Sequence, residues 1–296
     1  MTDRRSAALP TLALLAVTAA WGSTFFLIKD LLTEISVLDF LAVRFAIAAA
    51  VLVAVAPRSL LRLSRDERKR GVALGVVYGI AQVLQTLGLE RTSASVSGFV
   101  TGMYVVATPV LAALLFKERV GRTVLAAVML ATAGLAFLSL QGLAISPGVA
   151  TIFLSAMLYA LHIVGLGRWS TAANAMGMSV LQMLVICLVC TVASAPNGIG
   201  TPDSTSGWLS LVYMAVVAGA GALLAQTWAQ AHLSSTRAAV IMTMEPVFAA
   251  FFAVLFGGEH LTTRILLGGL LVLTAMFLVE LSPREEAELD SGPPAP

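Results

Sequence analysis

The sequence predicts an all-α integral membrane protein with ten transmembrane helices, arranged as two inverted five-helix repeats. Three observations support this fold class: the composition, a succession of long apolar stretches, and a weak internal repeat. Of the 296 residues, 58% are hydrophobic and 11% are charged, and the mean hydropathy is +0.93. Soluble domains are about 45–50% apolar and about 25% charged. This chain is therefore too apolar to belong to the soluble class.

Each membrane-spanning helix needs about 20 mostly apolar residues, and ten stretches meet this requirement. In chain order, we expect helices at 10–29, 38–56, 71–89, 95–116, 122–140, 147–167, 177–195, 208–230, 237–256 and 264–281. The first stretch continues past a signal-peptide-like segment, so we interpret it as a retained helix. Gly71, Gly75 and Gly79 recur every four residues, which predicts close packing of the third helix. The polar, Pro-rich tail after residue 281 is expected to be disordered.

The distribution of Lys and Arg predicts the orientation, because cytoplasmic loops carry an excess of these residues. With a cytoplasmic N-terminus and alternating helices, 14 of the 18 Lys and Arg residues fall on the cytoplasmic side. Lys29, Arg91 and Arg264 fall outside, and Arg44 falls within a span. We therefore expect both termini in the cytoplasm.

The internal repeat aligns residues 85–120 with residues 226–261, without gaps, at an offset of 141. Eight of 36 positions are identical, a match that two apolar helices would partly reach by chance. Each half holds five predicted helices, an odd number, so the halves must have opposite topology. We expect residues 1–141 to form the first repeat and residues 142–296 to form the second repeat and the tail. Inverted repeats are typical of secondary transporters, whose substrate site lies near the midplane between the halves.

Polar and aromatic side chains stand near the middle of several predicted spans. In a bilayer such groups face the bundle interior or an aqueous cavity, although each one alone also fits an interhelical hydrogen bond. Their shared depth favours a cavity with aromatic walls, which suits an amphipathic small molecule. The candidate substrate-binding residues are Trp21, Thr24, Tyr78, Gln82, Tyr104, Tyr159, His162 and Glu245.

Glu245 is the one charged residue in the otherwise uncharged stretch 238–256. A charge at that depth costs about 2.5–3.5 kcal/mol on insertion scales. Two states make the position tolerable: a protonated carboxyl group, or a carboxylate that faces water and meets a cationic group such as a substrate amine. We interpret Glu245 as a substrate contact or a proton-coupling group, and a neutral brace between helices is the alternative.

Three further residues are interpreted as structural or gating positions. Arg44 lies about two turns below the outer end of its helix, where a brace is favoured over a ligand for a substrate carboxylate. It would otherwise snorkel to the interface or pair with Asp39. Pro109 and Pro246 stand in corresponding helices of the two halves, and interrupted helices in such positions are a pointer to a carrier site. A simple packing kink is the alternative for each proline.

Four stretches carry a family resemblance: AAWGSTFFLIK at 19–29, VRFAIAA at 43–49, TSASVSGFVTGMYVVATPVLAALLFKERV at 92–120, and STRAAVIMTMEPVFAAFFAVLFGGEHLT at 235–262. Together they resemble the drug/metabolite transporter superfamily, in its EamA-like branch. The resemblance implies a ten-helix carrier in the bacterial inner (plasma) membrane that moves small metabolites, often amino acids, usually outward. In one respect the halves differ, because Pro109 lies nine residues before Glu118 and Pro246 lies thirteen before Glu259. Both glutamates stand at predicted helix ends, where charge is solvated, and we assign them no chemistry.

We therefore expect a secondary transporter that exports small amphipathic metabolites, with amino acids, aromatic ones included, as the leading substrates. Multidrug or dye efflux is the alternative. An intramembrane enzyme is less favoured, because no catalytic set of paired aspartates, Ser/His or HExxH lies in the spans. Cys187 and Cys190 are interpreted as packing residues, and we expect no metal and no cofactor. The expected partners are the lipid bilayer and a small-molecule substrate, with no nucleic acid, and the oligomeric state stays open.

Overall fold

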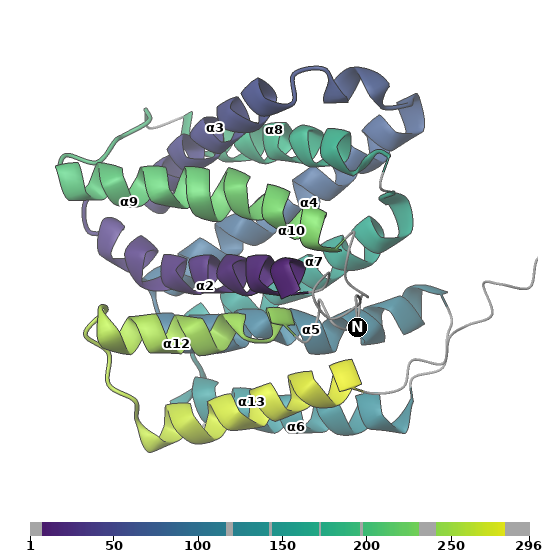
Figure 1. Cartoon of the computed structure of the whole chain (residues 1–296). Helices are drawn as coiled ribbons and strands as arrows, with labels where there is room; N and C mark the ends of the chain where they lie inside the picture. The colour runs from purple at the N-terminus through teal and green to yellow at the C-terminus, as the bar shows by residue number, and fades with distance from the viewer. Residues whose placement is uncertain are drawn as a thin grey trace, which may run out of the picture.

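The computed structural model describes residues 8–116, 121–141, 144–171, 173–195, 198–230 and 241–281. Long helices run side by side through this part of the chain (Figure 1). The helices are α2 (Ala8–Leu31), α3 (Val37–Val55), η1 (Ser59–Arg62), α4 (Arg65–Glu90), α5 (Ala94–Phe116), α6 (Arg122–Ser139), α7 (Pro147–Trp169), α8 (Ala175–Ser194), α9 (Thr205–Ala215), η3 (Val216–Gly221), α10 (Ala222–Gln230), α12 (Glu245–Leu255) and α13 (Thr263–Leu281). Two short strands, β1 (Leu140–Gln141) and β2 (Ala144–Ile145), pair antiparallel between α6 and α7.

Seven described segments are long and apolar enough to cross a membrane. They are Ala8–Leu31, Val37–Val55, Arg65–Glu90, Ala94–Leu115, Pro147–Leu166, Ala175–Ser194 and Thr205–Gln226. Shorter apolar helices, at Arg122–Leu138, Glu245–Leu255 and Thr263–Leu278, lie where the sequence predicts the other spans. These segments agree with the predicted helical membrane class.

Helix α4 begins well before the predicted start at residue 71, because its first turns are polar and capped. The Glu67 N–H donates to the Ser64 hydroxyl at 3.3 Å, and the Ser64 N–H donates to the Glu67 carboxylate at 2.8 Å. This capping box satisfies two backbone donors at the start of the helix. Hydropathy alone does not detect such a start, since no apolar residue is needed there.

Two predicted helices depart from regular α-helical geometry: the one at 208–230 contains a π-helical turn, which the sequence did not predict, and the one at 237–256 is interrupted beside Pro246, where a break was expected. The first passes through the π-helical turn η3, which is rich in Gly and Ala. In the second, a turn at Thr243 and Met244 precedes α12, which begins at Glu245. Residues 231–240, where that predicted helix begins, lie outside the described residues.

The helices pack in a regular order from one end of the bundle to the other. α6 packs on α13 at one end, and α3 packs on α8 at the other (Figure 1). Between these pairs, α7 contacts α4 and α5, while α2 contacts α10 and α12. One hydrophobic cluster contains Phe40, Leu52 and Leu211, and a second contains Val100 and Ile152. Each cluster joins helices from both halves of the chain.

The glycine stripe on α4 packs as the sequence predicts. Gly71, Gly75 and Gly79 are all buried, and α4 packs there on α8. A Cβ atom added at Gly75 would lie only 2.7 Å from the Val185 Cβ atom. Glycine at this position therefore permits the close approach of the two helices.

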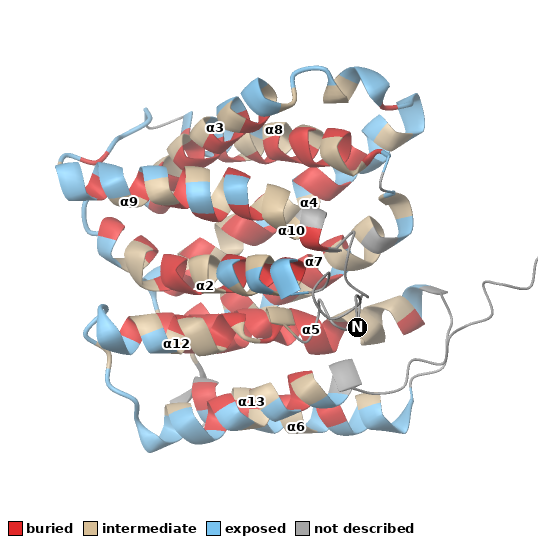
Figure 2. Ribbon diagram, viewed as in Figure 1, coloured by how far each residue is buried: buried red, intermediate tan, exposed pale blue. Residues whose placement is uncertain are grey.

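The outer surface carries many large apolar side chains, and the mainly apolar interior also holds several polar groups. Large apolar side chains such as Leu114, Met129 and Leu188 are exposed, whereas Gln82 and Arg44 are buried. Figure 2 shows exposed positions along the outer helices α6 and α13 and buried positions concentrated in the middle of the bundle. This distribution fits a surface that is solvated by lipid chains.

Candidate functional site

Six of the candidate substrate-binding residues form one connected group inside the bundle, which we call the inner polar cluster. Its members are Tyr78, Gln82, Tyr104, Tyr159, His162 and Glu245, all buried except the half-buried Tyr78. The Tyr78 ring meets the Tyr159 and His162 rings edge-on, with centroids 5.2 and 5.0 Å apart, respectively. Tyr78 also interacts with the Gln82 side chain, and it packs against the buried cluster that contains Tyr104 and Tyr159. The helices that supply these residues are α4, α5, α7 and α12.

Glu245 begins α12, with Pro246 beside it. The Tyr104 hydroxyl on α5 donates a hydrogen bond to the Glu245 carboxyl group at 3.2 Å. The first turn of a helix also presents N–H groups with partial positive charge, which favour an acidic side chain. The sequence interpretation placed Glu245 well inside a helix, whereas the turn before α12 puts it at a helix start.

A chain of hydrogen bonds extends from Tyr159 to α5. The Tyr159 hydroxyl donates to the Gln85 side-chain oxygen at 2.9 Å, and the Gln85 amide donates to the Thr101 hydroxyl at 3.1 Å. Nearby, the Ser155 hydroxyl donates to the Ala81 carbonyl at 2.8 Å. Gln85 lies on the same polar face of α4 as Tyr78 and Gln82. The spacing of these three residues in the sequence is the pattern that could have identified Gln85 as part of the site. Nothing in the sequence pointed to Thr101 or Ser155.

His162 links the cluster to α8. Its Nε2 atom and the Gln182 side-chain oxygen are 2.6 Å apart, and the Gln182 amide donates to the Met178 carbonyl at 3.1 Å. Both His162 and Gln182 are buried. With the Gln182 oxygen as acceptor, the geometry assigns the proton to His162 Nε2. In the neutral imidazole, the other ring nitrogen is then an acceptor.

Trp21 and Thr24 make their described contacts outside the inner polar cluster. The Trp21 indole N–H donates to the Ala218 carbonyl in η3 at 2.9 Å, and the Thr24 hydroxyl donates to the Trp21 carbonyl at 2.7 Å. Between them, the Ser23 hydroxyl lies 2.9 Å from the Tyr213 hydroxyl on α9. This part of α2 therefore contacts the interrupted helix α9–η3–α10, and the sequence did not reveal the pairing of Ser23 with Tyr213.

Arg44 is buried on α3 and is not paired with Asp39. Its guanidinium carbon lies 5.7 Å from the Phe40 ring centroid and 5.3 Å from that of Phe45. Asp39 instead accepts a hydrogen bond from the Ser194 hydroxyl on α8. Arg44 also does not reach the surface, since its side chain is only 6% exposed. The alternatives of a partner at Asp39 and of snorkelling are therefore wrong.

The two prolines occupy different places in their helices. Pro109 lies inside α5, which continues without interruption from Ala94 to Phe116, so the break expected there is absent. Pro246 lies in the first turn of α12, where its missing N–H has no helical partner to lose. A Cβ atom at Gly102 would lie 3.3 Å from the Pro246 ring, so α5 crosses α12 closely at this point.

Glu259 has a defined structural role that the sequence interpretation missed. Its carboxylate accepts hydrogen bonds from the backbone N–H groups of Ala94 and Ser95, at the start of α5. It therefore caps a helix of the other half of the chain, and it is half-buried instead of freely solvated. Glu118, its counterpart in the repeat, lies outside the described residues.

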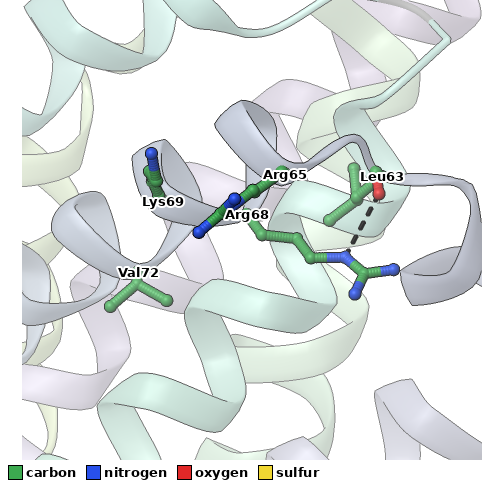
Figure 3. Close-up of a pocket in the computed structure, with 5 residues that line it drawn as sticks. All are labelled: Leu63, Arg65, Arg68, Lys69 and Val72. Atoms are coloured by element: carbon green, nitrogen blue, oxygen red, sulfur yellow. Dashed lines mark hydrogen bonds between the residues drawn. The ribbon is translucent and has the colours of Figure 1, made fainter.

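Two hollows lie at helix ends, and neither is lined by the inner polar cluster. One of about 740 Å³ is lined by Leu63, Arg65, Arg68, Lys69 and Val72 (Figure 3). There the Arg68 Nε–H donates to the Leu63 carbonyl at 3.1 Å. The second, of about 340 Å³, lies between η1 and the start of α8. The described residues hold no group of three His, Cys, Asp or Glu side chains that could bind a metal ion.

Comparisons with known proteins agree over most of the chain. The model of the EamA-like transporter family matches residues 9–140 and residues 146–281. An uncharacterized transporter of Archaeoglobus fulgidus is 31% identical over 275 residues, which cover 91% of this chain and 85% of the relative. A solved crystal structure of a protein matches with a TM-score of 0.61 and 17% identity, covering 91% of this chain and 96% of the other. At that identity, the structural match supports the fold alone.

Proposed function

This chain belongs to the EamA-like transporter family, and on that premise we propose that it is a secondary transporter for small amphipathic metabolites. The inner polar cluster carries the proposal. It gathers phenol, imidazole, amide and carboxyl groups from α4, α5, α7 and α12 in the interior of a bundle with an apolar exterior. Polar groups inside membrane proteins commonly mark substrate or ion pathways.

We propose that the chain forms ten transmembrane helices in two inverted halves, at 1–141 and 142–296. Two observations support this arrangement. The family model matches one stretch in each half. Helix contacts also recur between the halves: α7 packs on α4 and α5, and the corresponding helix α2 packs on α10 and α12. Rocking of one half against the other would then expose the inner polar cluster to each side of the membrane in turn.

Contacts between helix ends support the alternating topology. The Lys29 ammonium donates to the Thr92 carbonyl, and the Ser204 hydroxyl donates to the Glu34 carboxylate at 2.7 Å. All four residues fall on the predicted outer side. On the predicted cytoplasmic side, the Asn174 amide donates to the Glu67 carboxylate at 2.7 Å. These contacts fit the predicted alternation of the helices. From the excess of Lys and Arg on one side, we propose that both termini lie in the cytoplasm and that the protein resides in a bacterial inner membrane.

Amino acids, aromatic ones included, are the proposed substrates, and export is the proposed direction. The edge-on rings of Tyr78, Tyr159 and His162 offer an aromatic wall. Glu245 supplies an acidic group in the same cluster, suited to a substrate ammonium group. Binding of a substrate would require the cluster's present contacts, such as that between Tyr104 and Glu245, to rearrange.

The test is transport by the purified full chain in liposomes. Radiolabelled L-phenylalanine would be measured inside vesicles preloaded with unlabelled L-phenylalanine, L-alanine or buffer, with protein-free vesicles as the control. We expect saturable uptake that internal unlabelled substrate accelerates. Uptake without saturation or counterflow indicates a channel. If L-phenylalanine does not move while a cationic dye does, the amino-acid assignment is wrong and dye efflux replaces it.

A further inference from the structure

Arg44 carries a buried positive charge, and one of its hydrogen-bond donors, Nε–H, has no acceptor among the described residues. The side chain is 6% exposed, and its Nε atom is buried without a hydrogen-bond partner. Among the described residues, the recorded ion pair joins Lys69 to Asp66 and does not involve Arg44. Asp39, the acidic residue nearest to Arg44 in sequence on α3, contacts Ser194 instead.

The aromatic contacts of Arg44 do not replace a partner for its N–H groups. Phe40 and Phe45 offer ring faces at 5.7 and 5.3 Å, which attract a cation. The N–H donors of a guanidinium lie in its plane, however, and they require acceptor atoms at its edge. Buried donors without acceptors are rare in folded proteins because they are costly. If Arg44 only held helices together, nothing in the described part of the chain would offset the cost of its unpaired Nε–H donor.

Arg44 lies beside the inner polar cluster. The two rings that its guanidinium contacts, Phe40 and Phe45, belong to a buried hydrophobic cluster against which Tyr78 packs. Arg44 and the inner polar cluster together combine a basic group, an acidic group and aromatic rings. A molecule with a carboxylate, an ammonium group and an apolar side chain matches this combination.

We propose that Arg44 binds the carboxylate group of the transported molecule, and is therefore a specificity-determining residue. The inference rests on the proposed function and deepens it, because it restricts the substrates to molecules with an anionic group. The planar guanidinium can donate two parallel hydrogen bonds to a carboxylate. Lys supplies the charge without this paired geometry. Phe40 and Phe45 would hold the guanidinium in place for that contact.

The experiment compares two probes that differ at the carboxylate, L-phenylalanine and L-phenylalaninamide. Their binding to the purified full chain would be measured by thermal shift and calorimetry, and their transport would be measured in liposomes. The variants are Arg44→Gln and Arg44→Lys. Arg122→Gln is the matched control, because Arg122 is exposed at the start of α6. Equal yield and a single symmetric gel-filtration peak establish that each variant is folded.

For the wild type and Arg122→Gln, we expect L-phenylalanine to bind at least about tenfold more tightly than the amide, the value of one charge-assisted hydrogen bond. Arg44→Gln should remove this preference, and Arg44→Lys should restore part of it. If the wild type binds both probes equally, the inference fails while the transport function stands. If the wild type binds and transports neither probe, the amino-acid assignment fails and the inference falls with it. If Arg44→Gln does not fold, the test rests on Arg44→Lys. A smaller preference for L-phenylalanine over the amide than in the wild type supports the inference, and a preference equal to that of the wild type overturns it.

Discussion

The hydrogen bond between Tyr104 and Glu245 joins residues that are 141 positions apart, which is also the offset of the internal repeat. The two residues therefore occupy equivalent positions in the proposed halves, one on α5 and the other at the start of α12. A contact between equivalent positions lies where the halves meet. A movement of the proposed halves that separates the two residues would break this hydrogen bond, and the surroundings of Glu245 would then depend on the conformation of the bundle.

Glu245→Gln should reduce transport of L-phenylalanine by at least about tenfold and remove its dependence on pH. The amide can still accept the hydrogen bond from Tyr104, but it cannot titrate or hold a negative charge. The measurement is counterflow in liposomes at several pH values. Tyr104→Phe is the complementary variant, because it removes the donor and keeps the carboxyl group. Normal transport by Glu245→Gln together with a defect in Tyr104→Phe would show that Glu245 is only a brace.

Tyr159→Phe should weaken substrate binding more than it lowers protein abundance. The change keeps the ring that packs against Tyr78 and removes the hydroxyl that donates to Gln85. In the proposed site the hydroxyl would bond to the substrate, and a neutral hydrogen bond contributes about 0.5–1.5 kcal/mol, so we expect roughly a two- to twelvefold loss of affinity. Thr132→Val serves as a control, since the Thr132 hydroxyl is exposed and bonds to its own helix. An equal effect of both variants on affinity would contradict a specific role for Tyr159.

The C-terminal tail should be inaccessible from outside intact cells. The prediction follows from the excess of Lys and Arg on one side of the proposed helices. Ser291→Cys, in a background with Cys187 and Cys190 replaced by Ala, should react with a membrane-impermeant maleimide only after permeabilisation. Thr201→Cys, at an exposed position on the predicted outer side, should react without it. Labelling of Ser291→Cys in intact cells would overturn the orientation.

The sequence predicted the positions of helices well because a bilayer imposes a length of apolar chain on each span. It predicted the break beside Pro246, but it did not predict the π-helical turn η3 or the contacts that helix ends make with distant residues. The Ala218 carbonyl in η3 is satisfied by the indole of Trp21, which lies 197 residues away in the chain. The cap that Glu259 provides for Ala94 likewise spans 165 residues. Composition and periodicity carry no information about such partners.

Six of the eight residues that were selected by depth in a span lie together in the inner polar cluster, but depth does not fix which way a helix face points. Trp21 was chosen by depth, and its described hydrogen bond goes to η3. Gln182 joins His162, yet nothing in the sequence marked it. A helix can rotate about its axis without changing the depth of any residue, so these assignments needed the packing of α2, α7 and α8.

Gly75→Ala should destabilise the protein, because the added Cβ would lie 2.7 Å from the Val185 Cβ atom. Overpacking of this kind costs roughly 1–3 kcal/mol, despite the better helix propensity of Ala. The measurement is the midpoint of thermal unfolding in detergent. Gly121→Ala is the control, since a Cβ there meets nothing within 4 Å. Equal midpoints for the two variants would mean that α4 and α8 are less closely packed than described.

Glu259→Ala should destabilise the start of α5 and leave substrate preference unchanged. The Ala side chain cannot accept hydrogen bonds from the N–H groups of Ala94 and Ser95, which Glu259 satisfies. Loss of a helix cap costs about 0.5–2 kcal/mol, and we expect a lower unfolding midpoint with faster amide exchange at those two residues. Glu259→Gln keeps an acceptor oxygen and should recover part of the stability. Glu90→Ala is the matched control, because Glu90 is exposed at the neighbouring helix end. If Glu259→Ala is as stable as Glu90→Ala but alters substrate preference, Glu259 belongs to the transport pathway and is not a cap alone.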